Sequence, residues 1–222
     1  RVLLRGPNGP MLAAAWLAVM KAGAIAVTTM PLLRAKELGQ IVRKAEIDHA
    51  LCDARLLQEL AATTAETGRV AKTLTWGDGA LEQRMERQPA TFANVDTASD
   101  DVCLLAFTSG TTGNPKATMH FHRDVLAMAD VVGRHLLETG PDDVYVGSPP
   151  FGFTFGLGAL VVFPLRFRGA AALVEQPSPD NLLHAVQKFG GTCLFTAPTM
   201  YRNLATLVGK YDLKSLRKSV SA

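Results

Sequence analysis

The chain has 222 residues, enough to bury a hydrophobic core in one large domain or two small ones. Hydrophobic residues make up 48% of it and charged residues 19%, an ordinary globular composition that argues against disorder. The formal net charge of +3 is small, and no cluster of Lys and Arg forms a basic stripe. Nucleic acid is therefore not an expected partner.

The cysteines and the two longest apolar stretches bear on the cellular setting. Cys52, Cys103 and Cys193 stand far apart in apolar runs and match no metal-binding or redox spacing, which favours a reducing, cytoplasmic setting. The stretches 11–33 and 155–174 are interrupted by proline and by charged residues. Neither is a good membrane-spanning helix, so we expect no membrane span.

Short apolar strands alternate with helices through the first 76 residues. After a strand-and-turn pattern in 1–10, a helix is predicted up to Gly23, with Pro10 suited to its first turn. The elements that follow are strands at 24–29, 49–52 and 70–76 and helices at 34–46 and 54–66. This alternation predicts an α/β fold with parallel-rich sheets flanked by helices.

Residues 77–101 carry one short polar helix and a loop, and they suit a connector between two lobes. We place a first α/β lobe over 1–100 and a second over 101–222. The second lobe contains predicted strands at 102–107, 117–121, 144–148, 170–175 and 192–197, and predicted helices at 123–138, 156–165, 180–189 and 199–208. The chain starts without a methionine and stops in a strand-like run, so we expect a fragment of a longer protein.

The strand at 102–107 leads into the segment FTSGTTGNPK (107–116). Gly110 and Gly113 can take positive φ and let a ligand approach the backbone, whose successive N–H groups can form an anion-binding concavity. Lys116 supplies a mobile positive charge that suits phosphate. Four hydroxyl side chains add further donors: Thr108, Ser109, Thr111 and Thr112. The segment therefore indicates a polyphosphate-binding loop.

The spacing excludes the commonest alternatives. In a Walker A loop a lysine follows the second glycine directly, whereas here Gly110, Gly113 and Lys116 are three residues apart. The run FGLGALVV is not a G-x-G-x-x-G motif, because Val161 takes the last position. A plain polar loop is the usual outcome for Ser, Thr and Gly runs, but the density of phosphate-binding side chains favours the functional interpretation.

TSGTTGNPK resembles the phosphate-loop signature of the acyl-adenylate-forming (AMP-binding) superfamily, which includes acyl-CoA synthetases, peptide-synthetase adenylation domains and luciferase. The match is residue for residue except that Ala117 replaces the glycine that usually follows the lysine. The positions that match are Thr108, Ser109, Gly110, Thr111, Thr112, Gly113, Pro115 and Lys116. Flanking segments at 18–33 and 195–205, and His122, also resemble the family in the expected order.

The resemblance implies that ATP activates a carboxylate as an acyl-adenylate, whose acyl group then passes to a thiol, commonly that of coenzyme A. The loop residues Thr108 to Gly113 and Lys116 would bind ATP. Thr108 would help to hold Mg²⁺, and Lys116 would balance phosphate charge. Both are our candidate catalytic residues.

The run SPPFGFTFGLG (148–158) resembles the family motif beside the acyl pocket, and among subgroups it is most similar to ligases for benzoate or 2-aminobenzoate. An aromatic acid would stack on an apolar wall there. The candidate substrate residues are Phe151, Phe153, Phe155, Gly156 and Gly158. Phenylalanine at every second position is equally typical of a half-buried strand, and other small acids stay open.

The family's downstream Y-G-x-T-E segment and its small C-terminal domain with a catalytic lysine are absent, so we expect this chain alone to be inactive. Two other functions stay open: an ATP-dependent phosphotransferase and a non-catalytic nucleotide-binding module. The acyl acceptor and the oligomeric state stay open too, a homo-oligomer included. Asp142 and Asp143 are expected to be solvated turn residues.

Overall fold

The computed structural model describes residues 1–108 and 115–222. They form two compact units, Arg1–His122 and Arg123–Ala222, each with its own sheet. The α/β class predicted from the sequence is confirmed. The division falls after His122, not at residue 100, because the strands at 102–108 and 116–121 are hydrogen-bonded into the sheet of the first unit.

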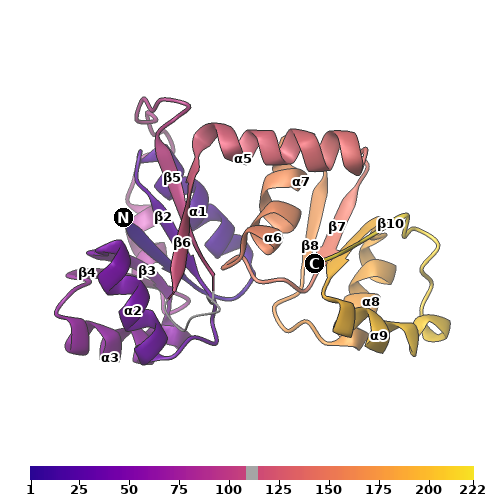
Figure 1. The fold of residues 1–222 in the computed structure, drawn as a ribbon, viewed down its shortest axis with the longest axis horizontal. Coiled ribbons are helices and arrows are strands. Elements are labelled where there is room, and N and C mark those ends of the chain that lie inside the picture. Colours follow the sequence, from indigo (N-terminus) through magenta and orange to yellow (C-terminus); the bar gives the residue numbers. More distant parts are fainter. Residues whose placement is uncertain (109–114) are drawn as a thin grey trace. The chain divides into compact units, whose positions relative to one another are not determined.

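The first unit is built on a six-stranded sheet of order β4-β3-β1-β2-β5-β6 (Figure 1). The first five strands in this order are parallel, and β6 runs antiparallel to β5. The strands are β1 (Val2–Arg5), β2 (Ala26–Thr29), β3 (His49–Asp53), β4 (Lys72–Trp76), β5 (Val102–Thr108) and β6 (Lys116–Phe121). Near-continuous apolar runs such as VCLLAF suit such a sheet, because helices cover its parallel strands.

Helices cover both faces of this sheet. Leu3 and Val27 face a core shared with α2 and α3, whereas the buried residues of α1, such as Trp16, lie outside that core. This fits right-handed crossovers, which place α1 on one face and α2 and α3 on the other. The helical segments are α1 (Pro10–Lys21), α2 (Ala35–Ala45), the 3-10 turn η1 (Ala54–Leu56), α3 (Leu57–Thr67) and α4 (Ala80–Glu86).

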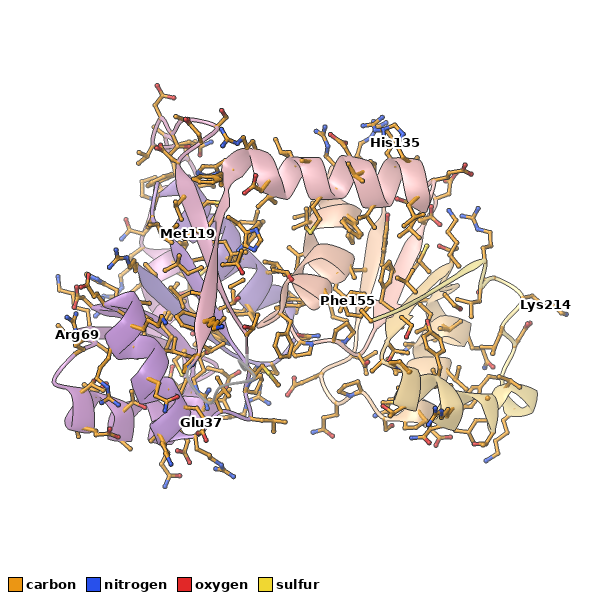
Figure 2. All side chains as sticks on the ribbon, viewed as in Figure 1. Glu37, Arg69, Met119, His135, Phe155 and Lys214 are labelled. Carbon is orange, nitrogen blue, oxygen red and sulfur yellow. The ribbon has the colours of Figure 1, made fainter. Side chains whose placement is uncertain are left out.

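Two carboxylates stabilise the start of α2. Glu37, labelled in Figure 2, accepts a hydrogen bond from the backbone N–H of Arg34 at 3.2 Å. Glu59 accepts one from the N–H of Ala35 at 2.8 Å and pairs with the Arg34 guanidinium at 2.9 Å. Glu37 and Glu59 thus each supply an acceptor for a backbone N–H group that a helix start leaves without an intrahelical partner.

The second unit is built on a parallel sheet of order β10-β9-β7-β8. Its strands are β7 (Val144–Gly147), β8 (Ala170–Leu173), β9 (Cys193–Thr196) and β10 (Lys218–Ser221). Its helical segments are α5 (His122–Met128), η2 (Ala129–Leu136), α6 (Thr154–Leu157), η3 (Gly158–Val162), α7 (Phe163–Phe167), α8 (Pro179–Phe189), α9 (Pro198–Ala205) and η4 (Val208–Lys210). No helix in the described part of the chain is long and apolar enough to cross a membrane.

The helix predicted over 123–138 is α-helical only to Met128 and then continues as the π-helical segment η2. Gly133 lies in η2 against α7: a Cβ there would come within 2.2 Å of the Phe167 ring. Asp130 on η2 also pairs with Arg166 on α7 at 2.9 Å. The π-helical segment η2 is therefore also the segment that packs closely on α7.

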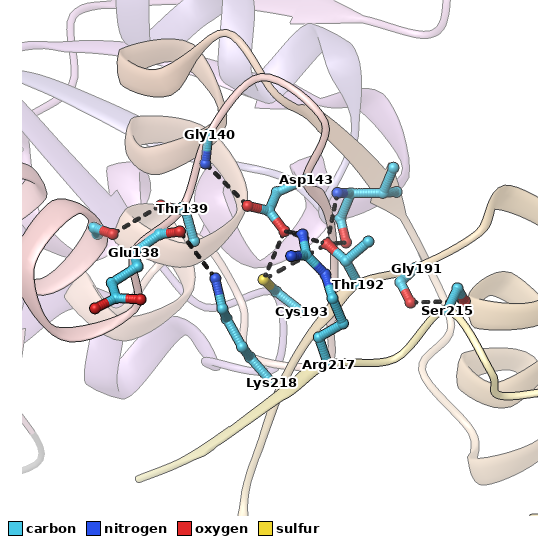
Figure 3. A network of polar contacts seen from close by, with 12 residues as sticks. Glu138, Thr139, Gly140, Asp143, Gly191, Thr192, Cys193, Ser215, Arg217 and Lys218 are labelled. Atoms are coloured by element: carbon cyan, nitrogen blue, oxygen red, sulfur yellow. Dashed lines mark hydrogen bonds and ion pairs between the residues drawn. The ribbon is translucent and has the colours of Figure 1, made fainter.

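A polar network around Asp143 joins three strands of the second unit (Figure 3). The carboxylate of Asp143 accepts hydrogen bonds from the Thr192 hydroxyl at 2.6 Å, from the Gly140 N–H at 2.9 Å and from the Arg217 guanidinium at 2.6 Å. The Asp143 side chain is only 3% exposed. The expectation of a solvated turn residue is therefore wrong for Asp143, because the carboxylate is turned inward to bind groups that precede β9 and β10.

Candidate functional site

The predicted phosphate loop connects the ends of two paired strands. Thr108 is the last residue of β5, Lys116 is the first residue of β6, and the two are directly opposite in the antiparallel register. Residues directly opposite in such a pair have Cα atoms about 4.5–5.5 Å apart. A hydroxyl and an ammonium group therefore stand together at the base of the connection 109–115. The sequence-predicted residues Ser109, Gly110, Thr111, Thr112 and Gly113 lie outside the described residues.

The position of this base in the sheet suits ligand binding. The parallel strands β1, β2 and β5 end at the same edge, and ligands of parallel α/β sheets bind outside the carboxyl ends of the strands. Thr108 and Lys116 are both exposed. Within residues 1–108 and 115–222, no carboxylate pairs with Lys116. This positive charge is available to an anionic ligand such as phosphate.

The donor set of the described residues limits how a magnesium ion could be held. The structure shows no group of three or more His, Cys, Asp or Glu side chains able to hold a metal, within the part of the chain that it describes. Mg²⁺ prefers oxygen ligands and commonly keeps several waters while binding substrate phosphates. The Thr108 hydroxyl is one suitable oxygen, so the site fits a magnesium ion held mainly by phosphate and water.

The three candidate phenylalanines of the acyl pocket lie in different surroundings. Phe151 is 1% exposed, whereas Phe153 is 37% exposed at the start of α6. Phe155, labelled in Figure 2, is half-buried on α6, with its ring centroid 6.0 Å from that of Phe195. The strand alternative is excluded, because α6 begins at Thr154 directly after a turn. Only Phe153 and Phe155 offer ring surface outside the core.

The two candidate glycines are explained by packing. A Cβ on Gly156 would lie 2.3 Å from the Pro150 carbonyl oxygen and 2.5 Å from that of Pro149. A Cβ on Gly158 would lie 3.1 Å from the terminal methyl group of Met128. Gly156 therefore lets α6 pack directly on the backbone of the preceding turn, a contact that no larger residue allows.

Ser148 and Thr196 are polar residues at the carboxyl edge of the second sheet that we did not predict as site residues. The Ser148 and Thr196 hydroxyls are hydrogen-bonded to each other, and the Ser148 N–H donates to the Phe195 carbonyl at 3.1 Å. A hydroxyl residue at the end of each buried strand run, VYVGS and CLFT, was the available signal. Both lie where ligands of parallel sheets bind.

Phe195 is the centre of an aromatic cluster below that edge. The rings of Tyr145, Phe155 and Phe163 have centroids 6.0–6.3 Å from the Phe195 centroid, within the range of favourable aromatic pairs. Burial raises the pKa of Tyr145 to about 12, so this phenol stays neutral at physiological pH. The cluster is therefore an apolar support for α6 and contains no acid or base for catalysis near neutral pH.

Comparison with known proteins shows one family over the whole chain. The family model described as "AMP-binding enzyme" matches residues 1–222. The chain is 32% identical over 214 residues to a 3-hydroxybenzoate–CoA/4-hydroxybenzoate–CoA ligase of Thauera aromatica, covering 92% of this chain and 40% of that protein. It is 31% identical over 235 residues to an anthranilate–CoA ligase of Pseudomonas aeruginosa, covering 100% of this chain and 43% of that protein.

Solved structures agree with these relatives. The anthranilate CoA ligase AuaEII in complex with anthranoyl-AMP superposes with a TM-score of 0.93 at 26% identity, over 99% of this chain and 43% of that one. ATP-bound MatB from Rhodopseudomonas palustris superposes with a TM-score of 0.83 at 25% identity, over 99% of this chain and 44% of that one. The chain thus spans about two fifths of the length of each of these four proteins.

Proposed function

The chain belongs to the AMP-binding enzyme family, and we propose that the parent protein, meaning the full open reading frame that contains this chain, is an AMP-forming acid–CoA ligase. A carboxylate oxygen of the acid attacks the α-phosphorus of ATP, and the bond from that phosphorus to the bridging oxygen breaks to release pyrophosphate. The thiolate of coenzyme A then attacks the acyl carbonyl carbon and releases AMP. Relatives that are acid–CoA ligases support this assignment.

The single observation that carries the proposal is the Thr108–Lys116 pair at the base of the loop. Negative charge grows on the leaving pyrophosphate as the bond breaks, and a positive charge fixed nearby stabilises it more than it stabilises the ground state. Lys116 supplies that charge. Thr108 would supply a hydroxyl oxygen to a bound Mg²⁺, which would neutralise phosphate charge. By their sequence, the loop residues 109–113 would supply N–H and hydroxyl donors.

We further propose an aryl acid, such as benzoate or 2-aminobenzoate, as the substrate. The relatives named above act on hydroxybenzoates and anthranilate, which supports this class. The exposed Phe153 and the half-buried Phe155 offer ring surface on which an aromatic acid can stack. Cys52, Cys103 and Cys193 are buried and form no disulfide within the described residues, which supports a cytoplasmic setting.

The test is carboxylate-dependent ATP–pyrophosphate exchange by the parent protein with benzoate, 2-aminobenzoate, acetate and a medium-chain fatty acid, with and without Mg²⁺. We expect exchange that requires an aryl acid and the metal. ATP cleaved to ADP would instead show a phosphotransferase, and ATP bound without any turnover would show a nucleotide-binding module.

The role of the loop is tested by Lys116→Ala in the parent protein. The variant removes one preorganised positive charge that stabilises the leaving pyrophosphate, so ATP–pyrophosphate exchange should slow by about 100-fold. The matched control is Lys72→Ala, because Lys72 is also an exposed lysine at the start of a strand in the same sheet and has no ion pair within the described residues. Unchanged exchange in Lys116→Ala would overturn the assignment of the loop.

A further inference from the structure

Arg5, the last residue of β1, is a buried cation whose partners are backbone carbonyls. Arg5 is only 1% exposed. Nη1 donates to the Met30 carbonyl at 2.9 Å, and Nη2 donates to those of Pro31 and Leu33 at 3.0 and 2.8 Å. Nε makes a longer contact of 3.4 Å with the Leu56 carbonyl.

No carboxylate forms an ion pair with Arg5 within the described residues. Burial lowers the pKa of Arg5, and the nearby Cys52 and Glu59 act in the opposite direction. Arginine stays protonated in proteins, so the charge is present. A buried charge is costly unless hydrogen bonds satisfy it, and an apolar residue of similar size is often more stable there. What the guanidinium provides is a set of donors for carbonyls of an irregular segment.

Three of the four acceptors lie in one connection, residues 30–34 between β2 and α2. These residues belong to neither a helix nor a strand, so their partly buried carbonyls need donors from elsewhere. The fourth acceptor, Leu56, lies in η1 after β3. Since β1 lies between β3 and β2, Arg5 joins the connections that leave its two neighbouring strands.

Arg5 lies where the connections that follow two neighbouring strands, β1 and β2, go to opposite faces of the sheet. The chain leaves β1 for α1 on one face of the sheet and leaves β2 for α2 on the opposite face. The carboxyl edge between two such strands is where parallel α/β sheets bind ligands. In this unit the side chain of Arg5 occupies that place, whereas Thr108 ends β5 on the other side of β2.

The connection held by Arg5 leaves the strand next to β5. In the β2–β5 register Ala26 is opposite Leu104 and Val27 is opposite Leu105. Both strands run parallel toward the same edge of the sheet, where β2 ends at Thr29 and β5 ends at Thr108. The first carbonyl bound by Arg5, that of Met30, therefore directly follows the strand next to the one that ends at Thr108.

We propose that Arg5 is a positioning residue for the nucleotide site, which fixes the connection 30–34 at the edge of the sheet where β5 ends and thereby holds Thr108 and Lys116 in place. The inference rests on the proposed function. It assigns Arg5 a role through other residues, because the guanidinium itself is buried and four of its five N–H donors bind the four carbonyls.

The test compares three variants of the parent protein: Arg5→Met, Arg5→Lys and the control Ile47→Ala. Ile47 is 0% exposed in the core of the same unit, two residues before β3 begins. It lies at the amino edge of the parallel strands, opposite to the edge from which the connection 30–34 leaves, so this variant lowers the melting temperature by a change away from the carbonyls that Arg5 binds. The readouts are kcat and KM for ATP in aryl-acid-dependent exchange, measured below all melting transitions, and amide hydrogen exchange over residues 30–34.

We expect Arg5→Met to lower kcat/KM for ATP by about 10- to 100-fold, the size of a misplacement near the reacting groups, and to speed hydrogen exchange at 30–34. Ile47→Ala should change neither. Arg5→Lys keeps the charge but has only three donors on a single nitrogen, so it should show the same defects in part. It also carries the test if Arg5→Met does not fold.

Kinetics for ATP in the Arg5 variants equal to those of Ile47→Ala would overturn the positioning role, even if both proteins are destabilised. Unchanged hydrogen exchange at 30–34 in Arg5→Lys would overturn it as well. Absence of exchange in the unaltered parent protein would be a failure of the proposed function instead, so the two failures are distinguishable.

Discussion

The phenylalanines at 151 and 153 are two residues apart yet should respond to substitution in opposite ways. Phe151 is 1% exposed, so Phe151→Ala leaves a cavity and should cost about 3–5 kcal/mol of stability. Phe153 is 37% exposed. Phe153→Ala should leave the melting temperature nearly unchanged and raise KM for the aryl acid in the parent protein. Equal loss of stability in both variants, measured by urea unfolding, would contradict this division.

The glycines at 156 and 158 provide a second contrast at the residue scale. Gly156→Ala forces a Cβ against two backbone oxygens that cannot move without shifting the turn, and such overpacking costs about 1–3 kcal/mol. Gly158→Ala meets the flexible end of Met128 at 3.1 Å, so it should cost less. Urea unfolding of the two variants checks the order. A Gly158→Ala variant less stable than Gly156→Ala would refute the packing argument.

Segments of secondary structure were predictable where hydrophobic pattern and end signals agree. Pro10 begins α1, Pro198 begins α9, and Gly190 directly follows α8 in a left-handed conformation, all of which are local signals. The π-helical segment η2 was not predictable, because the contact of Gly133 with Phe167 joins residues 34 positions apart. The burial of Asp143 depends on partners such as Arg217, 74 positions away, so it was missed for the same reason.

The carboxylate of Asp143 should make the second sheet sensitive to acid. Burial by itself raises the pKa of Asp143, but hydrogen bonds from Thr192 and Gly140 and the charges of Lys218 and Arg217 outweigh it and hold the pKa below its ordinary value. The stabilisation is therefore complete above the unfolded-state pKa of about 4 and is lost as the pH falls through the folded-state pKa.

Asp143→Asn should lower the free energy of unfolding by about 2–3 kcal/mol at pH 7. The loss is smaller than for breaking a fully buried ion pair, because Arg217 is 54% exposed. The difference from the unaltered chain should shrink as the pH falls below about 4. Urea unfolding at pH 7, 5 and 3.5 measures it, and Asp142→Asn, at an exposed neighbour, is the matched control. A difference that stays constant with pH would refute the ionised network.

At the scale of the whole molecule, each unit has its own sheet and its own core, so each has the means to unfold separately. The chain provides separate probes for the two. Both tryptophans, Trp16 and Trp76, are buried in the first unit, and all three tyrosines, Tyr145, Tyr201 and Tyr211, lie in the second. Tryptophan fluorescence therefore reports the first unit and near-ultraviolet tyrosine dichroism reports the second.

We expect Asp143→Asn to lower the urea midpoint followed by tyrosine dichroism and to leave the tryptophan midpoint unchanged, because no residue of the Asp143 network lies in the first unit. Ile47→Ala should do the reverse. Mutations in residues without shared partners act additively and independently, whereas a cooperative pair of units would transmit either change to both probes. Coincident shifts of the two midpoints in either variant would show that the two cores fold as one unit.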